Sequence, residues 1–280
     1  MHKTGRGSRD SLAQSVKKWG RPGHFVVIFP LQREAILPSP FVLFGPSHIA
    51  VIALAFVIPA VLAVLVRTLH AGDRAARWTF AAMLIGNWVF WYGLFWQRGW
   101  LTCGDALPMN LCDWANIATI VALLRPNQRS YELAYFWTLA GTLQGLMTPD
   151  TPYDFPEARF IIFSIFHAGL IAAVLYLTFG TRLRPYLSSL PRIVVWSLIY
   201  AAAAGAVDYA LGTNYGFLRA KPDHVSLFDF MPDWPRYIPV LIALGLLSAC
   251  VYYAPWLITD LMRKVTSRQA SRLSALARDR

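Results

Sequence analysis

The stretch SHIAVIALAFVIPAVLAVLV, residues 47–66, contains no Asp, Glu, Lys or Arg. A helix needs about 20 apolar residues to cross the roughly 30 Å hydrocarbon core of a bilayer, so the stretch has the length and composition of one span. Backbone polar groups find no water in lipid and must bond within the segment, and the stretch lacks the alternating pattern of a barrel strand. It therefore predicts a transmembrane helix.

Six further apolar segments follow along the chain, and we place them at residues 77–97, 108–124, 131–148, 160–179, 190–211 and 237–261. Each connection contains charge, proline or glycine, as in RPNQRS at residues 125–130. With 56% hydrophobic and 15% charged residues, the chain is too apolar for an ordinary soluble domain. The sequence predicts an all-α membrane protein, with a bundle of about seven transmembrane helices over residues 41–262.

The two ends of the chain are basic and carry much of the net charge of +11. Basic tails beside apolar spans fit anionic lipid head groups better than nucleic acid. We predict a basic, largely disordered extension over residues 1–40 and a basic cytoplasmic tail over residues 263–280. Membrane lipids are the expected partners, no nucleic-acid partner is expected, and the sequence leaves the oligomeric state open.

Charge in the connections predicts the orientation. With seven spans, the side that holds the C-terminal tail carries most of the basic connections, and the other side carries most of the acidic residues. Because cytoplasmic loops carry an excess of Lys and Arg, we expect the C-terminus in the cytoplasm and the N-terminus outside. The abundant aromatic residues, 11 Trp, 12 Tyr and 17 Phe, are typical of belts at the bilayer interfaces. The expected location is the cell membrane, as a multi-pass protein.

In this orientation, polar residues of five spans fall in the outer half of the membrane. They are His48, Asn110, Cys112, Asp113, Asn116, Gln144, His167 and Asp208. Polar groups are expensive in lipid and persist mainly where they have a function. Cys112 and Asn116 are four residues apart and share one face of the third helix. The pattern predicts a polar pocket that opens toward the outer leaflet.

Simpler interpretations exist for each member of this cluster. A lone cysteine in an apolar helix is usually a packing residue, and Asp113 near a helix N-terminus can act as a cap. Gly141 and Gly145 form a GxxxG step that allows close helix packing. The three cysteines lack the CxxC spacing of zinc sites, so no metal or cofactor is expected.

A non-enzymatic function is also compatible with the cluster. Asp113, Asp208 and His167 fit a transporter or a ligand-binding bundle, because carboxylates inside membranes often mark ion or proton pathways. An internal repeat would favour a transporter, but the seven segments contain no convincing one.

Five separated segments carry a family resemblance. They are LPMNLCDWA (107–115), YELAYFWTLAGTLQGLMTPD (131–150), RFIIFSIFHAGLI (159–171), LGTNYGFLRAKP (211–222) and SLFDFMPDWPRYI (226–238). Together they resemble the YwaF-like family of bacterial integral membrane proteins, over a region from about Phe41 to Leu261. That family is distantly related to vertebrate transmembrane protein 164, described as an acyltransferase that moves a polyunsaturated acyl chain onto an ether lysophospholipid.

The resemblance implies a chemistry for three positions, Asn110, Cys112 and His167. Cys112 would be the nucleophile and His167 its base, with phospholipid and lysophospholipid as substrates. Asn110 or Asn116 would donate a hydrogen bond to the oxyanion. Bacterial relatives commonly have histidine at the position of Asn110, so in this chain His167 would act as the single base.

Overall fold

The computed structural model describes residues 39–149, 151–222 and 227–278. The predicted N-terminal extension lies almost entirely outside these residues. The long helices are α1 (Pro46–Leu69), α2 (Asp73–Arg98), α4 (Leu111–Leu124), α7 (Ala158–Phe179), α8 (Ser189–Leu211) and α9 (Tyr237–Arg278). The shorter ones are α3 (Cys103–Ala106), α5 (Gln128–Trp137), the π-helix η1 (Thr138–Thr142), α6 (Leu143–Met147), and the 3₁₀ turns η2 (Tyr215–Phe217) and η3 (Leu227–Phe230).

The described residues form no β-strand, only an isolated bridge between Pro40 and Tyr153, so the predicted all-α fold is confirmed. Each predicted segment contains a helix, and the fourth is a continuous run of α5, η1 and α6. Helix α9 continues to Arg278 and so includes residues 263–278 of the predicted basic tail.

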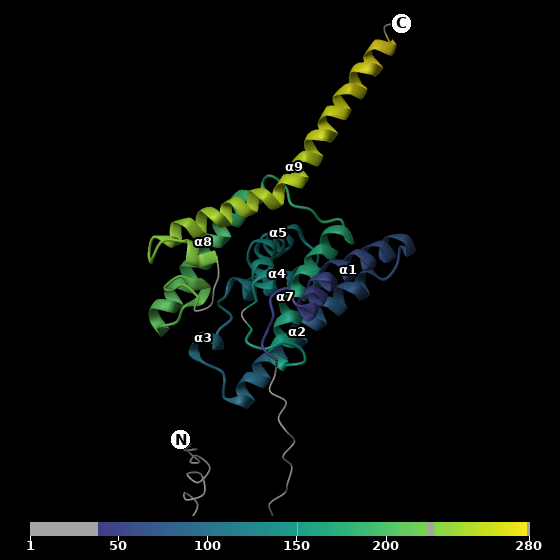
Figure 1. Cartoon of the computed structure of the whole chain (residues 1–280). Coiled ribbons are helices and arrows are strands. Elements are labelled where there is room, and N and C mark those ends of the chain that lie inside the picture. Colours follow the sequence, from purple (N-terminus) through teal and green to yellow (C-terminus); the bar gives the residue numbers. More distant parts are fainter. Residues whose placement is uncertain (1–38, 150, 223–226, 279–280) are drawn as a thin grey trace, which may run out of the picture. The chain divides into compact units, whose positions relative to one another are not determined.

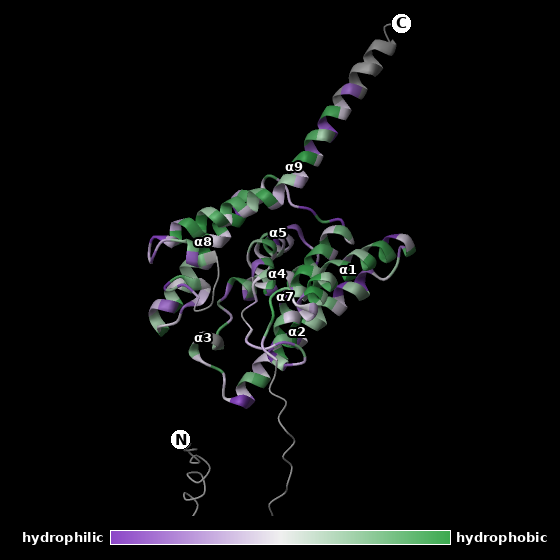
Figure 2. Cartoon of the chain, in the orientation of Figure 1, coloured by the Kyte–Doolittle hydropathy of each residue, from purple (hydrophilic) through white to green (hydrophobic). Residues whose placement is uncertain are grey.

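Helix α7 lies at the centre of the packing, with α1, α2 and α4 against it (Figure 1). Of its most apolar stretch 61% is buried, compared with 17% for α1. The outer side of α1 instead exposes aliphatic residues such as Leu54, Val57 and Val64. Figure 2 shows hydrophobic residues along these helices and hydrophilic residues gathered mainly in the connections. Extensive exposed aliphatic surface on helices is the surface expected to meet lipid.

Four helices in the described part of the chain are long and apolar enough to cross a membrane, namely α1, α7, α8 and the Tyr237–Ser267 part of α9. Helix α4 is apolar, but its 14 residues extend only about 21 Å at 1.5 Å per residue. Helix α2 has ample length, and its tryptophans and Asn87 make it less apolar. These helices identify a polytopic membrane protein, and the full number of crossings stays a prediction.

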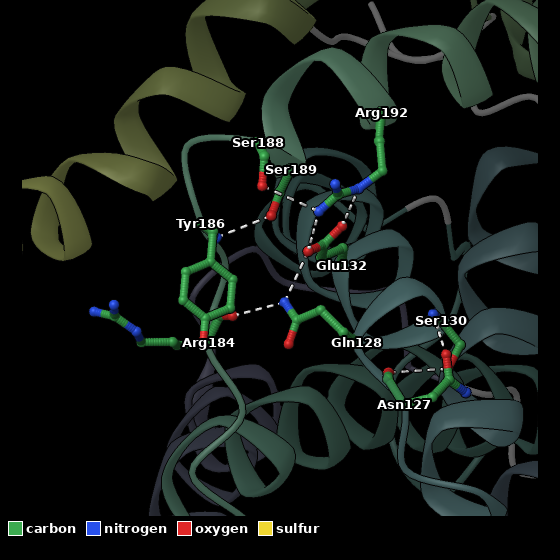
Figure 3. Close-up of polar contacts among 9 residues, drawn as sticks. All are labelled: Asn127, Gln128, Ser130, Glu132, Arg184, Tyr186, Ser188, Ser189 and Arg192. Atoms are coloured by element: carbon green, nitrogen blue, oxygen red, sulfur yellow. Dashed lines mark hydrogen bonds and ion pairs between the residues drawn. The ribbon is translucent and has the colours of Figure 1, made fainter.

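A half-buried ion pair joins the starts of α5 and α8 (Figure 3). The carboxylate of Glu132 accepts hydrogen bonds from Nε of Arg192 at 2.9 Å and from Nη2 at 2.7 Å. Gln128 donates to Glu132 and to the carbonyl of Arg184, and Arg184 pairs with Asp260 of α9 at 2.6 Å. This network fixes α5, α8 and α9 to one another at the end away from the candidate site.

Candidate functional site

A cavity of about 410 Å³ lies between α2, α4 and α7. Aromatic side chains form much of its wall: Trp88, Trp91, Tyr92 and Phe95 from α2, with Phe163 and Phe166 from α7. Polar side chains line it as well: Asn87, Asn110, Asp113, Thr151, Arg159 and His167. Three members of the predicted cluster, Asn110, Asp113 and His167, therefore meet in one cavity.

His167 lines this cavity from α7. Its Nδ1 lies 3.0 Å from the carbonyl oxygen of Phe163, so Nδ1 carries the proton and donates it. This tautomer leaves a lone pair on Nε2, the form that a general base requires. The ring stacks on Phe163 with centroids 3.9 Å apart. The hydrogen bond and the stacking fix the orientation of the imidazole.

Gly145 of α6 makes room for that imidazole. A Cβ at position 145 would lie 3.0 Å from both Nε2 and Cδ2 of His167. Glycine at this position thus lets the histidine approach α6 closely, a more specific role than helix packing alone.

Asn110 and Asp113 form the N-terminal cap of α4. The carboxylate of Asp113 accepts a hydrogen bond from the backbone N–H of Asn110 at 3.0 Å, as in a capping box. The side-chain oxygen of Asn110 accepts from the backbone N–H of Gly216 at 3.4 Å. The capping interpretation of Asp113 is therefore correct, and both residues also line the cavity.

Cys112 lies on a different side of α4 and does not line the cavity. It is half-buried, and its thiol faces the hydroxyl of Thr142 in the π-helix η1. Thr142 and Gly145 are three residues apart, so they share one face of the α5–η1–α6 run. Cys112 and His167 thus lie against the same face of this run, one turn apart. In the described part of the chain no hydrogen bond joins them.

The surroundings of Cys112 contain several unsatisfied polar groups. Asn116 is fully buried, and neither its Oδ1 nor its Nδ2 has a hydrogen-bond partner among the described residues. The hydroxyl of Thr142 has no hydrogen-bond partner there besides the thiol of Cys112, and that of Thr138, one turn earlier in η1, is buried and unpaired. A buried polar group left unpaired costs about 1–3 kcal/mol, and such groups, like π-helical turns, are often found at functional sites.

Besides Cys112 and Asn116, three further predicted members lie outside the cavity. Nδ1 of His48 accepts from the N–H of Phe44 at 3.0 Å, and its Nε2 donates to the carbonyl of Leu146 at 2.8 Å. Asp208 is fully buried at the end of α8, where it holds the following turn. Gln144 is exposed on α6. The structure therefore leaves these three side chains out of the cavity that His167 lines, although all fall in one half of the predicted topology.

Sequence reasoning missed three polar residues of the cavity, namely Asn87, Thr151 and Arg159. Asn87 lies within α2 and donates from Nδ2 to the carbonyl of Ile162 at 3.2 Å. Its signal was available, since it is a lone amide within an apolar segment. Arg159 was counted only as a loop charge, yet it lines the cavity at the start of α7.

The described residues bring together no group of three or more His, Cys, Asp or Glu side chains that could hold a metal ion.

Comparison with protein families gives one match. The model described as the TMEM164 family matches residues 43–253, which include every residue of the cavity. The search of curated proteins and the search of solved structures find no significant match. The expected relation to transmembrane protein 164 is thus confirmed at the level of the family, whereas the bacterial YwaF-like label stays a prediction. Because the match covers well over half of its 280 residues, the chain belongs to the TMEM164 family.

Proposed function

We propose that this protein is a lipid acyltransferase of the cell membrane, with Cys112 as its nucleophile and His167 as its base. One observation carries the proposal. Nε2 of His167, which carries a free lone pair, lies against Gly145 of the α5–η1–α6 run. The thiol of Cys112 faces Thr142 on the same face of this run. Apo geometry is often looser than that of the reacting complex, and the proposal requires a rearrangement that brings base and thiol together.

The first half-reaction forms a thioester. His167 takes the thiol proton of Cys112, and the thiolate attacks the ester carbonyl of a phospholipid. Asn116, whose amide has no other partner among the described residues, donates to the oxyanion. The ester C–O bond breaks, and the leaving lysophospholipid takes the proton from the imidazolium.

The second half-reaction transfers the acyl group. The hydroxyl of another lysophospholipid gives its proton to Nε2 of His167, and its oxygen attacks the thioester. The C–S bond breaks, and the proton passes from His167 to the thiolate, which restores the starting state. The aromatic walls of the cavity suit the apolar parts of both lipids.

The test uses purified full-length protein in detergent. Cys112→Ala and Cys112→Ser are compared with the wild type for exchange of a deuterated acyl chain between phospholipid and lysophospholipid, measured by mass spectrometry. Cys103→Ala and Cys250→Ala, which alter exposed cysteines, serve as controls. We expect exchange to fall to background only in the Cys112 variants. Full exchange in both Cys112 variants overturns the nucleophile.

A second candidate function is proton-linked transport or ligand binding. It is favoured by the fact that Asp113 and His167 line the cavity whereas Cys112 does not. Its measurement is solute uptake into proteoliposomes under a pH gradient, together with acyl exchange in the same preparation. Uptake that survives Cys112→Ala, without acyl exchange in the wild type, replaces the acyltransferase proposal.

A further inference from the structure

One end of the α2–α4–α7 cavity holds an arginine in an unusual setting. Arg159, the second residue of α7, lines the cavity near Thr151 and Pro152 of the preceding connection. Its guanidinium carbon lies 3.7 Å from the ring centroid of Trp100, within the range of a cation–π interaction. The indole therefore holds the guanidinium by one face and leaves its N–H edge available to a ligand.

The hydrogen-bonding capacity of this guanidinium is not used by the described residues. Nε of Arg159 is buried without a hydrogen-bond partner, and Arg159 forms no ion pair with a described carboxylate. A second guanidinium, that of Arg98, lies 5.5 Å from the same Trp100 ring but does not line the cavity. Burying an unpaired donor on a cation is costly, so this end of the cavity is complementary to an anion.

We infer that Arg159 binds the phosphate of a glycerophospholipid whose apolar part lies along the aromatic walls of the cavity. The planar fork of an arginine matches a phosphate with two parallel N–H···O bonds. Phe163 and Phe166 continue the cavity along α7 beyond Arg159, which suits the lipid chain and not a free ion.

The inference rests on the proposed function in one respect, the distance between the phosphate site and the proposed catalytic base. Arg159 and His167 are eight residues apart on α7, about 12 Å along the axis at 1.5 Å per residue. A phosphate held at Arg159 directs the glycerol and its ester groups inward, toward His167. Arg159 would thus select lipids that carry a phosphate and would orient them, without taking part in the bond changes.

The experiment measures lipid binding in the full-length protein in detergent micelles. A diazirine-bearing lysophosphatidylcholine is photo-crosslinked, and three competitors are compared: unlabelled lysophosphatidylcholine, monoacylglycerol of the same chain, and inorganic phosphate. In the wild type we expect lysophosphatidylcholine to compete roughly ten-fold better than monoacylglycerol, as for a charge-assisted hydrogen bond. In Arg159→Gln the two lipids should compete equally. Arg98→Gln is the matched control and should keep the wild-type preference, because Arg98 is near the same ring but outside the cavity.

A second measurement uses the unmodified chain. Phenylglyoxal modification of Arg159 is followed by mass spectrometry, and lysophosphatidylcholine should protect the residue whereas monoacylglycerol should not. Equal protection by both lipids, or an unchanged preference in Arg159→Gln, overturns the inference. Effective competition by millimolar phosphate alone also overturns it, in favour of a free-anion site.

The two proposals fail in different ways. Absence of acyl exchange in the wild type removes the acyltransferase but leaves the phosphate preference in place. Loss of the phosphate preference, with Cys112-dependent exchange intact, removes only the role of Arg159.

Discussion

The imidazole of His167 lies directly against Gly145, where an added Cβ would come within 3.0 Å of Nε2. That distance is tighter than ordinary van der Waals contact, so Gly145→Ala must displace the ring by a few tenths of an ångström. Small misplacements of a catalytic group are expensive, and we expect roughly a ten-fold loss of acyl exchange.

The matched control is Gly86→Ala in α2, where an added Cβ meets nothing within 4 Å. Alanine there should preserve exchange and raise helix stability by about 0.5–1 kcal/mol. Thermal unfolding of both variants separates loss of fold from loss of exchange. An equal loss of exchange in the two variants contradicts a role for the contact between Gly145 and His167.

Thr142 offers a test of the environment of Cys112. Its hydroxyl faces the thiol and has no other partner among the described residues, so it is available to stabilise a thiolate. Thr142→Val keeps the shape and removes the donor. We expect alkylation of Cys112 by a lipid-like maleimide to slow roughly ten-fold, the effect of losing one hydrogen bond to a charged atom.

Thr138→Val is the control, because Thr138 is also buried and unpaired within the same π-helix. It should leave the alkylation rate unchanged. Equal slowing in both variants would mean that the π-helix, and not the Thr142 hydroxyl, determines the reactivity.

Sequence patterns predicted the helices well, because the length and apolarity of a segment suffice to identify a span. They predicted the site less well, because rotation of each helix about its axis depends on packing. His48 shows the difference. Its position at the start of the first span was correct, but both of its ring nitrogens are bonded away from the cavity. Conversely, the sequence indicated for Arg159 only a charge in the connection before the fifth segment. The structure places its guanidinium over the ring of Trp100, at the start of α7.

Variants of Asp208 test whether its carboxylate has a structural role or acts in a proton relay. Its Oδ1 accepts from Oγ1 of Thr213 and from the N–H of Tyr215, both at 2.7 Å, and so fixes the turn after α8. Asp208→Asn retains an acceptor at this position, whereas Asp208→Ala removes it. We expect Asp208→Asn to resemble the wild type and Asp208→Ala to lose roughly 2 kcal/mol of stability.

Limited proteolysis with trypsin provides the readout for Asp208. Cleavage after Arg219 should accelerate in Asp208→Ala only, since Arg219 also donates to the backbone carbonyl of residue 208 at 2.9 Å. A relay that needs a titratable group predicts the opposite pattern, in which Asp208→Asn is folded but has no transport.

The ion pair between Glu132 and Arg192 gives a prediction about stability. The side chain of Glu132 is only 3% exposed, whereas that of Arg192 is 43% exposed. Arg192→Met therefore leaves a carboxylate buried without its cation, and removing one partner of such a pair is strongly destabilising.

The comparison variant is Arg184→Met, because its partner Asp260 is 27% exposed and can be solvated. We expect the midpoint of thermal unfolding to fall further in Arg192→Met than in Arg184→Met. The double variant Glu132→Gln with Arg192→Met should recover part of that loss, since the amide needs no counter-charge. A midpoint in the double variant as low as in Arg192→Met would show that the packing of Arg192, not the stranded charge of Glu132, determines the effect.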